Sequence, residues 1–169
     1  MSTFRKLFDN SSDTGTEACN LVQKFLSSAQ GYKLSEYTFT ELFAFLYFEL
    51  DSVMSARKME SRRSIVNSLS TAYCATLESK FRVKNVDEHI NMMKRRISEY
   101  AQDQNSGKER SDIVERLSFY LDQASIKNGY HVIGDPLGLG DFFVSMNGKM
   151  ELANFYIKLI APFVRKTIP

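Results

Sequence analysis

An aspartate and two arginines flank a predicted turn and are the residues whose spacing most clearly suggests chemistry. Asp51 lies near the end of the segment 38–56, while Arg62 and Arg63 begin the next predicted helix, at about 61–82. If the two helices fold back on each other, the three charges meet near the turn. They would form either a structural ion pair or a site where an arginine binds a phosphate or carboxylate. The sequence leaves both interpretations open.

Glu49 and Asp51 are the acidic residues in the second half of the apolar segment 38–56. They are two positions apart, so a helix directs them to different sides. A carboxylate buried without a partner is costly, which predicts a partner for each of them. An enzyme that uses Asp51, Glu49 or His131 as an acid or base is the corresponding functional alternative.

A basic island occupies the middle of the chain, with ten basic and four acidic residues between 57 and 96. If the helix at 61–82 and the next one are antiparallel, the run 57–63 would face the run 94–96. This island is either a solvated surface or a site for an acidic partner, an anionic ligand or a nucleic-acid backbone. It comes with no helix-turn-helix, zinc-finger or RNA-binding signature. The candidate binding residues are therefore Asp51, Arg57, Arg62, Arg63, Lys94, Arg95 and His131.

The remaining chemical groups do not form a known catalytic or metal-binding pattern. The loop 134–141 (GDPLGLGD) contains three glycines but lacks the Gly-Lys-Ser/Thr ending of a phosphate-binding loop. His131 stands at the entrance to this loop, and His89 lies in the first turn of a predicted helix. Cys19 and Cys74 fall on apolar helix faces and are expected to be buried thiols. We expect no catalytic residues, no metal and no cofactor.

Hydrophobic periodicity predicts six helices, and the second of them is apolar nearly all round. Capping-box spacing places the start of the first helix at Thr14 and Glu17, and that of the second at Thr38 and Glu41. The predicted helices cover about 16–30, 38–56, 61–82, 86–100, the stretch between Ser106 and Gly129, and 143–164.

The last predicted helix has an unbroken heptad-like spacing of apolar residues. Its expected inner face is Phe143, Met146, Met150, Ala153, Ile157, Ile160 and Val164. An alternative interpretation makes 142–146 a strand followed by a turn at 147–148. The first and last helices are expected to cover aromatic side chains that the central helices would otherwise expose.

These patterns predict one all-α domain over residues 1–169, a bundle of about six helices around the aromatic-rich segment 38–56, with 1–13 as a flexible lead-in. The chain has 169 residues and a net charge of +2. It shows no signal-peptide pattern and no apolar run long enough to span a membrane, so we expect a cytoplasmic protein. Its general look is that of a small bacterial or phage-borne helical protein.

The absence of a catalytic pattern, together with the basic island, favours a non-enzymatic interaction or regulatory module. Its partner would be another protein or a second copy of the chain. The alternative from another class is a bundle that binds an apolar or amphipathic small molecule, with Asp51 or an arginine as the polar anchor.

Overall fold

The computed structural model describes residues 2–29, 32, 34–127 and 148–168, and it confirms the all-α fold. Within these residues there is no strand. The helices before residue 128 are α1 (Ser2–Ser28), α2 (Glu36–Ala56), α3 (Arg62–Ser79), α4 (Asp87–Asn105) and α5 (Arg110–Lys127). Residues 148–167 then form the last helix, which includes the π-helical turn η1 (Tyr156–Ile160) and α7 (Ala161–Thr167).

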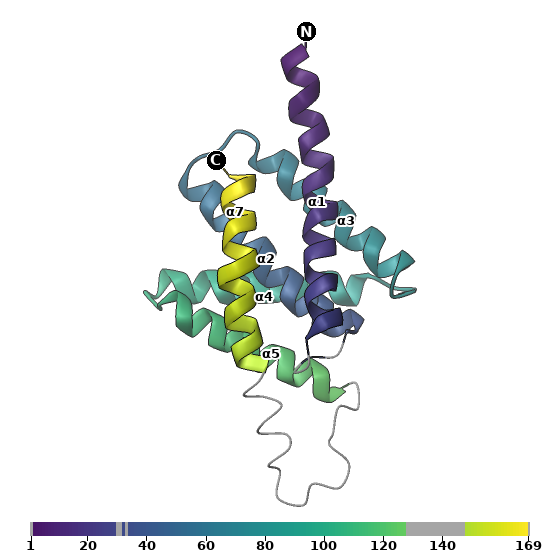
Figure 1. Ribbon diagram of the computed structural model, residues 1–169, viewed down its shortest axis with the longest axis vertical. Helices are drawn as coiled ribbons and strands as arrows, with labels where there is room; N and C mark the ends of the chain where they lie inside the picture. The colour runs from purple at the N-terminus through teal and green to yellow at the C-terminus, as the bar shows by residue number, and fades with distance from the viewer. Residues whose placement is uncertain (1, 30–31, 33, 128–147, 169) are drawn as a thin grey trace, which may run out of the picture.

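Helix α2 lies at the centre of the fold, as its composition predicts. It packs against α1, α3, α4 and α5, and nearly every residue from Thr38 to Leu50 is buried (Figure 1). Its aromatic side chains contact both α3 and α4. The Phe43 ring lies 4.9 Å from that of Tyr73 on α3, and the Phe45 ring lies 5.6 Å from that of Tyr100 on α4. These aromatic contacts, together with the area they bury, hold α2 between its neighbours.

A small polar network inside the core joins α2, α3 and α4. The Thr40 hydroxyl lies 2.8 Å from the Tyr73 hydroxyl and 3.3 Å from Nδ1 of His89, and Tyr73 donates to the His89 backbone carbonyl at 3.2 Å. His89 is buried, and this burial lowers the pKa of its imidazole. Since its ring lies among these hydrogen-bonding groups, His89 has a structural role that links three helices.

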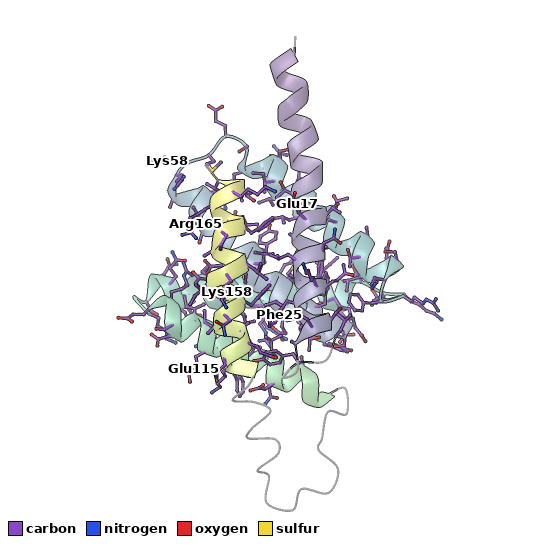
Figure 2. The ribbon with its side chains drawn as sticks, viewed as in Figure 1. Glu17, Phe25, Lys58, Glu115, Lys158 and Arg165 are labelled. Carbon is purple, nitrogen blue, oxygen red and sulfur yellow. The ribbon has the colours of Figure 1, made fainter. Side chains whose placement is uncertain are left out.

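Helix α1 and the last helix run antiparallel over one side of α2 (Figure 1). Phe25 stacks on Phe155 with ring centroids 4.1 Å apart, and Glu17 binds the Lys166 ammonium group at 3.0 Å (Figure 2). Phe39, Phe48 and Phe155 are all buried. The contact with α1 covers Phe155, whereas Phe48 is covered by Tyr100 of α4 and by Arg110 of α5.

Two predicted helix starts were wrong. Helix α1 begins at Ser2, so Thr14 lies inside the helix and is not its N-cap. The capping box of α2 is formed by Ser35 and Thr38, not by Thr38 and Glu41. Ser35 accepts a hydrogen bond from the Thr38 amide at 3.2 Å, and the Thr38 hydroxyl in turn accepts from the Ser35 amide at 3.0 Å. Glu41 is therefore available for a partner elsewhere.

Gly15 marks the closest approach of α1 to α3. It is buried, and its amide donates a hydrogen bond to the Ser68 hydroxyl at 3.1 Å. A Cβ atom at this position would lie 2.7 Å from the Ser68 carbonyl carbon, closer than van der Waals contact allows. The backbones of α1 and α3 can approach this closely only because residue 15 lacks a side chain.

We predict that Gly15→Ala destabilises the protein by roughly 1–3 kcal/mol, because the added methyl group must push α1 away from α3. In an open helix the same change would stabilise the fold by about 1 kcal/mol. Urea unfolding of the variant beside Thr16→Ala, at the next and exposed position, checks this. A Gly15→Ala protein more stable than the wild type would refute the close contact.

Candidate functional site

Three carboxylates on α2 each pair with an arginine from a different surrounding helix. The shortest nitrogen-to-oxygen distances in these pairs are 2.7–2.8 Å. The pairs are Asp51 with Arg62 of α3, Glu41 with Arg96 of α4, and Glu49 with Arg110 of α5. The sequence predicted the first pair and the need for a partner at Glu49.

The pair of Glu41 and Arg96 is the most extensively hydrogen-bonded of the three. Arg96 donates to Glu41 at 2.8, 3.0 and 3.1 Å and to Glu99 at 2.9 Å, and Tyr120 donates to Glu99 at 2.7 Å. The guanidinium also stacks on the Tyr120 ring, 3.4 Å from its centroid. Burial by itself lowers the pKa of Arg96, but its hydrogen bonds with the two carboxylates raise it above the ordinary value. Arg96 is thus a fixed cation.

Glu49 lies deeper than its arginine partner. The side chain of Glu49 is 6% exposed and that of Arg110 is 33% exposed. Burial raises the pKa of Glu49 to about 7, against the opposing influence of Arg110 and of a hydrogen bond from Tyr156. Arg110 also lies over the Phe48 ring, 5.4 Å from its centroid. Glu49 is therefore a carboxylate that changes its protonation near neutral pH inside the fold.

Asp51 and Arg62 form the pair that the sequence predicted at the turn. Arg62 donates to the two carboxylate oxygens at 2.7 and 3.0 Å. The pair borders a surface depression of about 230 Å³, which is also lined by Tyr47, Arg63 and Val66. Because Arg62 already uses its planar edge on Asp51, Arg63 is the arginine that an anion would meet there.

The basic island does not form one surface. Helix α3 packs mainly on α1 and α4 packs mainly on α2, and the two diverge from their connection (Figure 1). The expected approach of 57–63 to 94–96 was therefore wrong. Arg96 turns inward to Glu41, and Arg57 donates to the Ile168 carbonyl at 3.4 Å. Lys94 and Arg95 are exposed on α4.

The remaining candidate residues either lie outside the described part of the chain or are at least partly buried. His131, the loop 134–141 and the alternative strand at 142–146 lie outside the described residues. Cys19 is buried, as expected, and burial raises the pKa of its thiol to about 11, which makes it a poor nucleophile. Cys74 is only half-buried. In the described part of the chain no group of three or more acidic, histidine or cysteine side chains could hold a metal, and no helix could cross a membrane.

The last helix buries Ile160 and Val164 of the face that its heptad spacing predicted, but not the described residues before them. Leu152 and Phe155 are buried before the π-helical turn, and Ile160, Phe163 and Val164 are buried within or after it. An α-helix that buries 152 and 155 would next bury 159, but the wider π turn shifts the inner face by one residue to Ile160. Leu159 is correspondingly 41% exposed.

This shift leaves the earlier described residues of the predicted inner face exposed to solvent. Met150 is 61% exposed, Ile157 is 66% exposed, and Ala153 between them is also exposed. Their spacing of three and four places them on one side of the helix. We call Met150, Ala153 and Ile157 the outer stripe.

A broad depression of about 560 Å³ lies between α5 and the start of the last helix, where Lys149, the residue before Met150, lines it. Phe119, 57% exposed, is its apolar member. The other lining residues are Glu115, Arg116, Tyr120, Asp122 and Lys149. Exposed apolar side chains surrounded by charged groups are typical of a protein-binding surface. Sequence periodicity missed this surface because it assigned the outer stripe to the core.

Comparison with known proteins returned no matching family model, curated protein or solved structure. The function must therefore be argued from the geometry of this chain.

We predict that protonation of Glu49 makes the free energy of unfolding fall as the pH rises from about 5 to 7. In that window the folded protein retains a proton at Glu49 that the unfolded chain has lost, because the pKa of about 7 lies above the ordinary value of 4.5. The decline amounts to about 3 kcal/mol at most. Urea unfolding across this range should show that Glu49→Gln removes the decline. Glu115→Gln, on an exposed carboxylate, should retain it. If the free energy of unfolding depends on pH in the same way for wild type and Glu49→Gln, the raised pKa of Glu49 is contradicted.

Proposed function

We propose that this protein is a non-enzymatic helical interaction module that binds another protein through the outer stripe and Phe119. The observation that carries the proposal is the exposure of Met150 and Ile157 on a helix whose other face, with Leu152, Phe155 and Ile160, is buried. Large apolar side chains that the core does not use are costly to leave in water unless a partner covers them. Helix recognition commonly uses apolar positions at this spacing.

The polar groups of the core support a structural role over catalysis. The carboxylates of α2 pair with arginines, and Arg96 is further held by Glu99 and Tyr120. A catalytic acid or base needs access to a substrate as well as a suitable pKa. Glu49 has a raised pKa, but it is buried behind Arg110.

The small-molecule alternative receives less support. The phenylalanine side chains of α2 are buried and pack against one another and against Tyr73 and Tyr100. The depressions beside Phe119 and beside Asp51 are lined largely by polar side chains. Sites for apolar ligands are instead concave and lined mainly by apolar side chains.

We predict that a benzophenone side chain placed at position 157 forms a crosslink to one defined protein in the cells that make this chain. The same group at position 71, exposed on α3, is the control and should form no such adduct. Adding Met150→Glu should abolish the crosslink from position 157 without lowering the melting temperature, since Met150 is exposed. Equal adducts from positions 157 and 71 would refute the proposal.

A further inference from the structure

The outer stripe has a cation at each end. Lys149 directly precedes Met150, and Lys158 directly follows Ile157. Their positions are about 14 Å apart along the helix axis, from the rise of 1.5 Å per residue. Arg165 lies two turns further along the same helix (Figure 2). The single acidic residue between 148 and 167 is Glu151, which is half-buried.

These cations are largely available to a partner. Lys149 is 52% exposed and lies 3.9 Å from Glu115, at the outer limit of an ion pair. Lys158 and Arg165 are exposed, and in the described part of the chain neither forms an ion pair. Lys166 differs from them, since Glu17 binds it at 3.0 Å. The last helix therefore carries exposed positive charge beside the outer stripe that the core does not need.

We infer that the partner of the outer stripe is an acidic amphipathic helix, an inference that rests on the proposed function. Its apolar positions would pack on Met150, Ala153 and Ile157, and its acidic residues would meet Lys149 and Lys158. Complementary charge around an apolar contact determines which partner binds and in which register. The partner's chemistry thus follows from the apolar spacing and the terminal cations together.

Two other occupants fit less well. In an antiparallel pairing of two copies that places Met150 against Ile157, Lys149 of one copy would lie near Lys158 of the other. A parallel pairing would bring identical cations together, so a second copy adds like-charge repulsion in both cases. An anionic membrane would attract the cations, but a helix needs a broader apolar face to enter the headgroup region. A stripe of three side chains is narrower than the apolar face of an interfacial helix.

Fluorescence anisotropy with two synthetic amphipathic helices tests the inference. Both peptides have the same leucine spacing, one with glutamate flanks and the other with lysine flanks. We expect the glutamate peptide to bind at least about tenfold more tightly, and added salt to reduce this preference. Lys158→Glu should weaken binding of the glutamate peptide, whereas Lys84→Glu, at an exposed position between α3 and α4, should not.

Ile157→Glu separates the inference from the proposed function. If Ile157→Glu abolishes binding of both peptides and Lys158→Glu changes neither, the outer stripe is a docking surface but its acidic partner is refuted. Tight binding to vesicles of phosphatidylcholine and phosphatidylglycerol, with no binding to either peptide, would identify an anionic membrane as the partner and refute the acidic helix. Concentration-dependent dimers in sedimentation velocity that Ile157→Glu dissociates would identify a second copy as the occupant. Binding of neither peptide, with no effect of Ile157→Glu in any assay, would refute both proposals.

Discussion

The burial of α2 imposes the constraint on which the rest of the structure depends. This helix lies inside the bundle but carries Glu41 and Glu49, which are only 2% and 4% exposed. A buried carboxylate must be neutralised or hydrogen-bonded, so the surrounding helices have to supply cations at fixed positions. Arg96 of α4 and Arg110 of α5 meet this need, and Arg62 of α3 does the same for Asp51 nearer the surface. The polar pairs thus fix where three helices sit along α2, while aromatic and aliphatic side chains together form the apolar core.

Apolar periodicity was sufficient to predict the all-α fold and the central place of α2, because a helix that is apolar nearly all round has to be surrounded. The predicted turn between two helices further placed Asp51 near Arg62 and Arg63, and it left open which arginine would pair and whether the group is structural or a site. Apolar periodicity failed where buried polar residues form part of the inner face. On α4 the buried positions include His89 and Asp103, and Arg96 is turned inward, so the inner face differs from the purely apolar stripe. Since charged residues are normally assigned to the surface, their burial could be recognised only from their partners in three dimensions.

The last helix shows a second limit of periodicity, because two apolar stripes overlap on it. The π turn at Tyr156–Ile160 allows the helix to bury Leu152 and Phe155 as well as Ile160 and Phe163, and it leaves the outer stripe in solvent. The same turn brings Tyr156 to Glu49, so it is tied to the buried ion pairs of α2. The proposed binding surface therefore depends on how this helix packs on the core.

Lys58 and Arg82, with positive φ angles of 52° and 57°, show that the chain also accepts mild backbone strain after α2 and α3.

The central claim is that buried ion pairs position the helices around α2, and a double-mutant cycle on Glu41 and Arg96 tests it most directly. Arg96→Met should cost about 3–5 kcal/mol, because it leaves the Glu41 carboxylate buried without its cation. Glu41→Leu should cost less, because Arg96 keeps its hydrogen bond to Glu99 and its stacking on Tyr120. The double variant should recover most of the loss caused by Arg96→Met. A parallel cycle on the more exposed Asp51 and Arg62 should give a coupling of only about 1 kcal/mol or less. If the two cycles give the same small coupling, the pairs would be incidental to the fold, and apolar packing alone would position the helices.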